Sequence, residues 1–508
     1  MFEGQPKGLW ALAFANTGER FGYYTMLAVF ALFLGENFGF AAGTASEIYT
    51  WFLTLVYFLP LVGGMAADRW GYSRMVVIGI LIMFLGYLLL SVPLGGGTVA
   101  IAAMGAALLL VSFGTGLFKG NLQVMVGDLY NDPQYAAKRD SGFSLFYMAI
   151  NVGAMFAPTA AVKIMAWAHE SLGVSVNDSY HFAFAVACAS LVLSIAIYYA
   201  CRPWFKHVEN TAKQAAASGQ KVEELSPEQT KKRIVALCLV FAVVIFFWMA
   251  FHQNGLTLTY FADKFVNPII TGTQTMAFNI WNLVLVAIGV YGLFGIFGEG
   301  SAKSKTIWGV VTAAVVGILA LQYAHHPAEL HISAPIFQQF NPFYVVALTP
   351  VSMAIFGALA KKGKEPSAPR KIAYGMLVAA AAYAEMAFCS VGLLTPNAQE
   401  AALEAGESPL MVNANVLIGT YLVLTFGELL LSPMGISFVS KVAPPQYKGM
   451  MMGGWFVATA LGNFLVSVGG FLWGNLPLWL VWSVFIGVCL IAAIFMFAMM
   501  GKLEDATK

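Results

Sequence analysis

The chain has 508 residues, of which 59% are hydrophobic and only 10% charged, and its mean hydropathy is +0.74. Soluble domains carry about 25% charged residues, so the composition excludes an ordinary soluble protein and indicates a polytopic membrane protein. The net charge of +2 and the lack of a basic stripe interleaved with aromatic residues exclude nucleic acid as a partner.

Hydropathy along the chain predicts fourteen membrane-spanning helices. A helix needs about 20 mostly apolar residues to cross a bilayer, and such continuous runs exclude a transmembrane β-barrel, whose strands alternate. The first run lacks a cleavage signature and is predicted to be an uncleaved helix. The predicted spans are residues 8–35, 46–67, 74–94, 99–127, 141–163, 181–201, 234–262, 276–298, 306–324, 336–360, 372–395, 411–440, 449–474 and 478–501.

A polar, charged segment separates the sixth span from the seventh. It contains Ser, Pro and Gln residues and is typical of a linker on one side of the membrane. The predicted organisation is therefore an N-terminal six-helix bundle at 1–201, a cytoplasmic linker at 202–233 and a C-terminal bundle at 234–508.

The lysines and arginines predict the orientation of the chain. If the N-terminus is cytoplasmic, only Lys163 and Lys264 of the 27 basic residues fall in outside segments, and Arg20 and Lys119 fall within helices. Basic residues are enriched in cytoplasmic loops. We therefore expect a multi-pass protein of the inner or plasma membrane with both termini in the cytoplasm.

Several ionisable residues fall inside the predicted spans. Each costs on the order of 2.5 to 3.5 kcal/mol near the bilayer centre, so such groups usually face a cavity or one another. The mixture of signs fits a site for a zwitterion or a set of exchanging ion pairs better than a pore for one ion sign. These residues are Glu19, Arg20, Lys119, His252, Glu385 and Glu428.

Local patterns suggest what these groups do. Glu19 and Arg20 are neighbours, so their side chains diverge by about 100° on a helix, and we expect them to point at different partners. Glu428 lies one turn before a proline, which opens a kink. The alternative is that these groups only satisfy one another. For Glu385, the alternative is that a neighbouring hydroxyl satisfies its carboxylate.

Two further segments, "NVGAMFAP" at 151–158 and "NPFYVVALTP" at 341–350, predict irregular backbone. Broken helices at membrane depth are tolerated where they are buried in protein or line a water-filled cavity. Simple helix kinks remain the alternative in the second half. The five cysteines show no CxxC spacing, so we expect no metal site.

Several motifs together resemble the proton-dependent oligopeptide transporters, a branch of the major facilitator superfamily. The resemblance extends from residue 16 to residue 455, and the motifs follow the family's order. They are "ERFGYY" (19–24), "GGMAADRWGYSR" (63–74), "FKGN" (118–121), "FYMAINVG" (146–153), "FNP" (340–342), "GELLLSPMG" (427–435) and "GGW" (453–455).

The resemblance implies an all-α major facilitator fold, with two six-helix bundles around a central cavity and two extra helices, which we place at about 276–324. It implies that Arg20 and Lys119 face the carboxylate of a peptide. Its amino group would be held by Glu428 with Asn151 and Asn341. The pockets for the backbone and side chains would be lined by Tyr24, Tyr57 and Trp455.

Two positions depart from the family pattern. The first glutamate of the family's first-helix motif is Asn16, which cannot carry a proton, and His252 stands where relatives tend to carry an acid. The candidate proton carriers are therefore Glu19, Glu428 and His252, and we expect Glu19 to do the coupling because its proton affinity depends on nearby cations. The alternative for His252 is a hydrogen-bonded packing residue.

The predicted function is proton-coupled symport of di- and tripeptides into the cell by alternating access. The alternatives are a transporter of another small solute, such as an amine, a drug or a nitrate-like anion, and a peptide facilitator that has lost proton coupling. The sequence contains no HExxH or GxSxG motif, either of which would indicate an enzyme. We expect no cofactor besides the coupling protons, and a monomer in the lipid bilayer.

Overall fold

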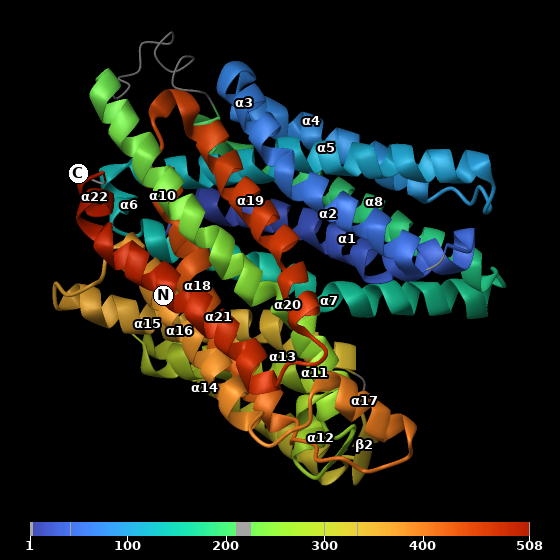
Figure 1. The fold of residues 1–508 in the computed structure, drawn as a ribbon. Helices are drawn as coiled ribbons and strands as arrows, with labels where there is room; N and C mark the ends of the chain where they lie inside the picture. Colours follow the sequence, from blue (N-terminus) through green and yellow to red (C-terminus); the bar gives the residue numbers. More distant parts are fainter. Residues whose placement is uncertain (1–3, 41, 210–224, 299, 333, 507–508) are drawn as a thin grey trace. The chain divides into compact units, whose positions relative to one another are not determined.

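The structure is a computed structural model, and it describes residues 4–40, 42–209, 225–298, 300–332 and 334–506. The described chain is almost entirely helical (Figure 1). Thirteen helices in it are long and apolar enough to cross a membrane. With α1 (Lys7–Phe38), which is long enough but carries two charges in its middle, the count matches the fourteen predicted spans. The all-α polytopic fold is therefore confirmed.

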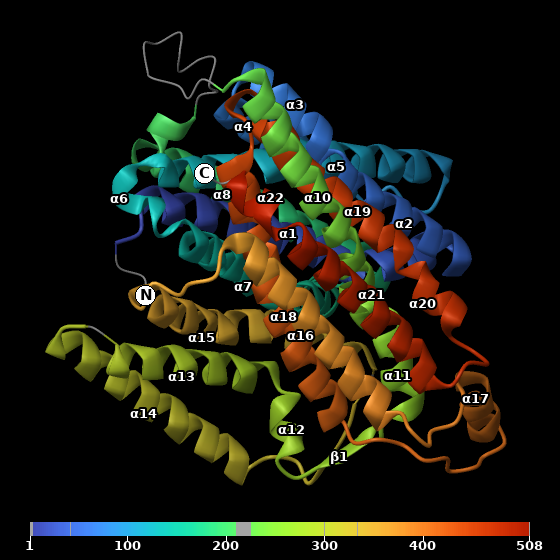
Figure 2. The same ribbon diagram turned by 60° about the vertical axis from the view of Figure 1, so that its left-hand side comes forward.

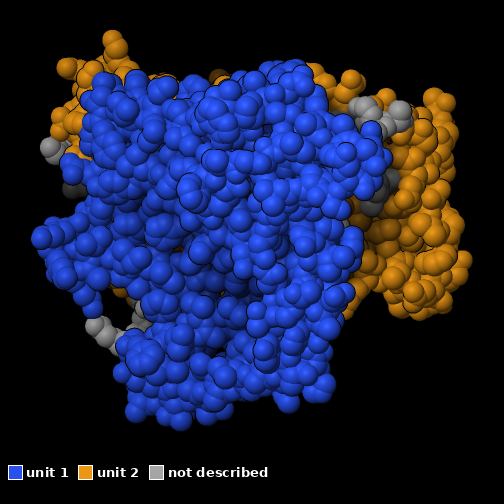
Figure 3. Space-filling view, turned by 60° about the horizontal axis from the view of Figure 1, so that its bottom comes forward, with its two compact units in different colours: residues 1–3, 246–432, 462–500 blue, residues 4–245, 433–461, 501–508 orange. Residues whose placement is uncertain are grey.

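The chain divides into two compact units, which we describe separately (Figure 3). Unit 1 comprises residues 1–3, 246–432 and 462–500, and unit 2 comprises residues 4–245, 433–461 and 501–508. Unit 2 contains residues from both predicted halves of the chain, whereas the described residues of unit 1 all come from the second half. The predicted bundle boundaries at 201 and 234 stay a prediction, and the predicted linker falls partly outside the described residues.

Unit 2 is built on the first helices of the chain. These are α1, α2 (Ala42–Phe58), α3 (Pro60–Trp70), α4 (Tyr72–Leu90), α5 (Thr98–Asp128), α6 (Pro133–Ala136), α7 (Arg139–Leu172) and α8 (Val176–Ala200), with the short 3-10 turns η1 (Leu129–Asn131), η2 (Arg202–Trp204) and η3 (Lys206–Val208).

Three long helices contribute to both units. They are α10 (Pro227–Phe251), α18 (Asn415–Val442) and α19 (Lys448–Leu465). The turn η6 (Pro445–Tyr447) lies in unit 2. The last helix, α22 (Met500–Asp505), also lies in unit 2 except for its first residue.

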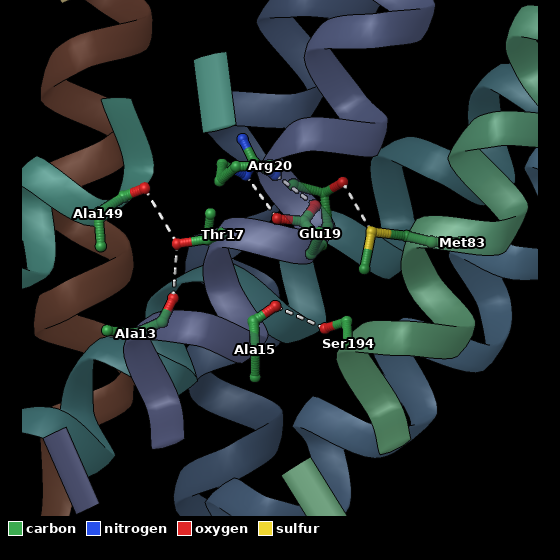
Figure 4. A network of polar contacts seen from close by, with 9 residues as sticks. Ala13, Ala15, Thr17, Glu19, Arg20, Met83, Ala149 and Ser194 are labelled. Atoms are coloured by element: carbon green, nitrogen blue, oxygen red, sulfur yellow. Dashed lines mark hydrogen bonds and ion pairs between the residues drawn. The ribbon is translucent and has the colours of Figure 1, made fainter. Parts of the chain in front are cut away.

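Helix α1 packs between α7 and α8 in unit 2. Thr17 donates to the carbonyl oxygens of Ala13 and Ala149, both at 2.9 Å, and Ser194 donates to the Ala15 carbonyl oxygen at 2.5 Å (Figure 4). Hydroxyls that bond to backbone carbonyls act as polar links between helices where no water competes. These contacts fix the rotation of α1, and with it the direction of the next two side chains, Glu19 and Arg20.

One end of unit 2 joins early and late parts of the chain. The Asp68 carboxylate at the end of α3 accepts hydrogen bonds from the backbone N–H groups of Gly449 (2.8 Å) and Met450 (2.9 Å), at the start of α19. The first N–H groups of a helix have no partner within the helix and favour an anion. Beside them, Lys448 forms an ion pair with Asp128.

Unit 1 contains most of the remaining helices. They are η4 (His252–Gly255), α11 (Thr257–Phe265), α12 (Gln274–Ala277), α13 (Ile280–Phe297), α14 (Ala302–Ala324), η5 (Ala334–Gln339), α15 (Phe340–Lys361), α16 (Ala368–Cys389), α17 (Pro396–Glu404), α20 (Ser467–Leu472) and α21 (Leu478–Ala498). Within it, α16 packs along α21, where Trp482 donates from its indole nitrogen to Ser390 Oγ at 3.0 Å.

A small antiparallel ribbon lies at the base of the predicted extra helix pair. Strand β1 (Ile269–Thr271) pairs with β2 (Glu329–His331), so that Thr271 lies opposite Glu329. Between the two strands the chain forms α12, α13 and α14, and the hairpin of α13 and α14 packs on α15 through α13 (Figure 2). Only Val315 of α14 is buried, so this helix is peripheral in unit 1.

The expectation of broken helices at the prolines is wrong. Helix α7 continues through 151–158 and α15 through 341–350, and α18 also continues through Pro433, where the expected kink stays a prediction. Prolines are tolerated in membrane helices when neighbouring groups accommodate the lost hydrogen bond. The predicted seventh span does break, at η4, where α10 gives way to α11.

Candidate functional site

Glu19 and Arg20 form a buried ion pair with each other (Figure 4). Arg20 Nε lies 2.5 Å from Glu19 Oε2, and Arg20 Nη2 lies 2.5 Å from Glu19 Oε1. The side chains are 0% and 1% exposed. Our expectation that the two would point at different partners is therefore wrong. The 100° divergence applies to the Cβ atoms, whereas the longer side chains fold back to pair in a bidentate geometry.

Arg20 still has donor capacity after this pairing. Its Nη1 is buried and has no hydrogen-bond partner among the described residues. Its guanidinium carbon lies 4.5 Å from the centroid of the Tyr23 ring, and the buried Tyr23 hydroxyl likewise has no hydrogen-bond partner in the described chain. Leaving a buried donor without a partner is costly. Arg20 Nη1 can therefore donate a hydrogen bond to a ligand without first breaking one within the protein.

The second cation of this cluster, Lys119 on α5, lies between two aromatic rings. Its Nζ is 4.0 Å from the centroid of Tyr57 and 4.6 Å from the centroid of Phe456. No hydrogen bond or ion pair joins this ammonium to another residue in the described part of the chain. Aromatic faces stabilise a cation by roughly 0.5 to 2 kcal/mol, less than a carboxylate would in the same surroundings. Lys119 is therefore poised to bind an anion.

Phe456 was missed by the sequence reasoning, which chose the preceding Trp455. The indole of Trp455 is buried against Gly435, where an added Cβ would lie 1.9 Å from the ring. Gly435 thus leaves the room that Trp455 fills, which links two of the sequence motifs. Phe456, one residue further along α19, carries the contacts to Lys119 and Tyr57. Only its place beside "GGW" could have indicated this.

Tyr24 and Asn151 are two further predicted site residues that belong to unit 2. Tyr24 packs edge-on against Tyr23, with ring centroids 5.3 Å apart. Asn151 on α7 is buried and donates to the Tyr147 carbonyl oxygen at 3.0 Å. Neither contact tests the predicted role of Tyr24 or Asn151 in binding a peptide.

In unit 1 the predicted pair of Asn341 and Glu428 is brought together. Asn341 Nδ2 donates to Glu428 Oε2 at 2.7 Å and to Thr425 Oγ1 at 3.1 Å. Glu428 is only 3% exposed. Its carboxylate accepts a hydrogen bond from the neutral Asn341 amide of α15. A buried acid held in this way attracts an ammonium group.

His252 occupies the first position of η4, and its contacts in unit 1 include a hydrogen bond and a ring stack. Its Nδ1 donates to Asn463 Oδ1, and its ring stacks on Trp248 with centroids 4.8 Å apart. This geometry favours the alternative of a hydrogen-bonded packing histidine. Its role in proton transfer stays a prediction.

Glu385 lies on α16 in unit 1. Its Oε1 lies against Gly419 of α18, where an added Cβ would be 2.7 Å away. The expected hydroxyl partner is not found among the described residues. The structure thus gathers the predicted residues into a cationic cluster in unit 2 (Glu19, Arg20, Lys119) and an acidic cluster in unit 1 (Asn341, Glu428).

The chain is similar to known membrane transporters along most of its length. The model of the POT family matches residues 73–223 and 318–470, together more than half of the chain. Dipeptide and tripeptide permease A of Yersinia pestis is 27% identical over 484 residues, which cover 91% of this chain and 83% of that protein. The uncharacterized transporter YclF of Bacillus subtilis is 29% identical over 503 residues, covering 94% and 90%.

Solved structures share the fold. A peptide transporter POT in complex with alafosfalin is 23% identical, has a TM-score of 0.61 and covers 100% of this chain and 97% of its own. The tetrameric protein PepTSo2 is 20% identical, has a TM-score of 0.55 and covers 99% of both chains. At this level of identity these structures establish the fold, and the two clusters described above rest on this chain's own geometry.

Proposed function

Because the chain belongs to the POT family, we propose that it imports di- and tripeptides into the cell by proton-coupled symport. The observation that carries the proposal is that unit 2 buries cationic groups and unit 1 buries an acid. In the cationic cluster, Arg20 Nη1 has no hydrogen-bond partner among the described residues and Lys119 lies between aromatic rings, and in the acidic cluster the buried Glu428 carboxylate accepts from Asn341. A zwitterionic peptide offers the matching carboxylate and ammonium.

Recognition through the two ends of a peptide explains how one site accepts many sequences. The α-carboxylate would bind Lys119 and Arg20, and the α-ammonium would bind Glu428 beside Asn341. Tyr24, Tyr57, Asn151 and Trp455 would complete the surroundings, to which we add Phe456. The acid at Glu428 disfavours a nitrate-like substrate, since it would repel an anion.

Proton coupling is proposed to depend on the pair of Glu19 and Arg20. When Glu19 is ionised, it holds two nitrogens of Arg20. When Glu19 is protonated, the pair weakens and the guanidinium becomes available to the peptide carboxylate. Binding of a proton and binding of a peptide would then favour each other, as symport requires.

Alternating access is supported by the contacts at one end of unit 2. Lys448 pairs with Asp128, and Arg139 Nη1 donates to Ser440 Oγ at 2.7 Å. These bonds join the first and second halves of the sequence at the end that the charge distribution places in the cytoplasm. We propose that they close the cytoplasmic entrance and break when the peptide is released inside.

Driving force limits what coupling can achieve. One charge moving through 100 mV provides about 2.3 kcal/mol, which corresponds to roughly 40-fold accumulation of a neutral peptide. We further propose that both termini are cytoplasmic and that one chain suffices for transport. The chain would act without chemical change of the peptide and without a cofactor besides protons.

Uptake into proteoliposomes tests the proposal. The purified protein is given labelled dialanine with an inside-negative potential and an inward pH gradient, each also collapsed separately. We expect accumulation above the outside concentration that disappears when both gradients collapse. Equilibration without accumulation would favour the second candidate, a facilitator, in which Asn16 marks lost coupling. Absence of uptake, while the protein remains folded, would overturn peptide transport.

A further inference from the structure

Unit 1 contains a cavity that the charged clusters do not use. It has a volume of about 590 Å³ and lies between the hairpin of α13 and α14 on one side and α15 on the other. This volume falls in the range of about 300 to 1,000 Å³ that is typical of ligand pockets. Its walls include Leu283 and Val286 on α13, Leu319 and Ala320 on α14, and Phe343 on α15.

The lining of this cavity is apolar except near one end. Its walls come mainly from helices that are apolar and long enough to span the membrane, and α14 exposes large apolar side chains such as Ile318 and Leu321. Apolar cavities do not hold water stably. At membrane depth the available apolar filler is therefore a lipid chain, which reaches the cavity from the surrounding bilayer.

One polar atom in the cavity wall lacks a partner. Asn282, in the first turn of α13, is 4% exposed and lines the cavity. Its Nδ2 donates to the Met276 carbonyl oxygen at 3.1 Å, whereas its Oδ1 has no hydrogen-bond partner among the described residues. A buried acceptor without a donor costs about 1 to 3 kcal/mol. The carbonyl oxygen of Asn282 thus calls for a ligand that carries an N–H or O–H donor.

Basic side chains stand at the same end of the hairpin. Tyr323 lines the cavity and stacks on His326 with ring centroids 4.9 Å apart. His325 and His326 follow the last residue of α14, and Nδ1 of each donates to a backbone carbonyl oxygen. Each ring can therefore present Nε2 to an anion when it is protonated. Glu329 on β2 is the acid of this region, and His331 accompanies it on the same strand.

We propose that this cavity is a binding site for a glycerophospholipid. One acyl chain occupies the space between α13, α14 and α15, and the phosphate lies at His325 and His326. A donor on the headgroup, such as the ammonium of phosphatidylethanolamine, bonds to Asn282 Oδ1. The apolar cavity matches the acyl chain, the two histidines match the phosphate, and the unpartnered acceptor matches the headgroup ammonium.

Photo-crosslinking of the full chain in vesicles tests this site. The probe is phosphatidylethanolamine with a diazirine in one acyl chain, and labelled peptides are identified by mass spectrometry. We expect labelling of α13 and α15. Ala320→Trp fills the cavity and should lower this labelling about tenfold. Ala314→Trp makes the same change on α14 away from the cavity lining and should leave it unchanged.

Two further arms separate the headgroup from the chain. The double variant His325→Ala with His326→Ala should weaken labelling by the phospholipid but not by an uncharged diazirine fatty alcohol. A phosphatidylcholine probe, whose headgroup has no donor, should label about fivefold less than phosphatidylethanolamine, a difference that Asn282→Leu should remove.

Equal labelling of the two tryptophan variants would overturn the proposal, because it would mean that lipids only surround the hairpin. Labelling by the fatty alcohol that exceeds labelling by the phospholipid, and that ignores the histidines, would overturn it in favour of a general apolar site. Folding of each variant is checked by its thermal unfolding. Because no transport is measured, these outcomes do not depend on whether the chain moves peptides.

Discussion

The two charged clusters solve the problem of burying ions in different ways. In the cationic cluster, Arg20 is neutralised by the adjacent Glu19, while Lys119 is stabilised only by aromatic rings. In the acidic cluster, the buried Glu428 carboxylate accepts a hydrogen bond from the neutral Asn341 amide. The difference teaches that the cationic cluster combines a cation between aromatic rings with an ion pair that can rearrange, whereas the acidic cluster holds its acid through an amide. Fixed charges suit recognition, and the pair suits coupling.

The largest effect on peptide uptake should come from removing the charge of Lys119. Lys119→Met keeps the length of the side chain but removes its charge, and peptide uptake should fall about 100-fold, because a charge-assisted bond to a buried carboxylate contributes up to about 3 kcal/mol. Uptake of dialanine into proteoliposomes measures it. Lys163→Met, an exposed lysine of the same unit, is the control. Uptake near the original level would show that Lys119 does not bind the peptide.

Next in size is the loss of coupling. Glu19→Gln cannot change its protonation, so the accumulation of dialanine should fall from the ceiling of roughly 40-fold to about one. Exchange of labelled for unlabelled peptide should persist, since exchange needs no net proton movement. Glu36→Gln makes the same change at an exposed position of α1. If Glu19→Gln still concentrates peptide, the proposed coupling role is wrong.

Removing the charge of Glu428 should have a smaller effect on transport, because the hydrogen bond with Asn341 is retained. Glu428→Gln can still accept a hydrogen bond from Asn341 but no longer attracts an ammonium, so KM for dialanine should rise about tenfold. N-acetyl-dialanine, which lacks the ammonium, should show no such change, and Thr425→Val serves as the control for the local hydrogen bonds. An equal change in KM for both substrates would show that Glu428 does not bind the amino group of the peptide.

The smallest effect is expected at His252. His252→Gln preserves a donor for Asn463, so accumulation should stay within about twofold of the original protein. The dependence of uptake on external pH should also be unchanged. A loss of accumulation as complete as that of Glu19→Gln would instead make His252 a proton carrier and move the coupling from unit 2 to unit 1.

Sequence reasoning predicted the helices well because hydropathy is a local property. It also predicted that Asn341 and Glu428 would act together, although they are far apart in the chain, because the family motifs carry them. It failed at Glu19 and Arg20, where the positions of Cβ atoms were used to judge side chains long enough to curve back. Local patterns cannot decide such a pairing, since it depends on which other partners the fold supplies.

Phe456 shows a second limit. It is one of 40 phenylalanines in an apolar chain, and apart from its place beside "GGW" nothing in the sequence distinguishes it from a core residue. Its contact with Lys119 exists because α19 approaches α3 and α5 closely enough that Gly64 faces the backbone of Gly449. Such approach is a property of the packed unit, and it cannot be read from either segment alone.

The β1–β2 ribbon also has a consequence for how such chains change over generations. Thr271 and Glu329 are cross-strand partners, so the two ends of the stretch that carries α12, α13 and α14 already lie where a tight two-residue turn would join them. A gene could therefore lose this cassette, or acquire it, in one event without moving α11 or α15. The ribbon marks a natural seam at which the architecture tolerates cutting and rejoining.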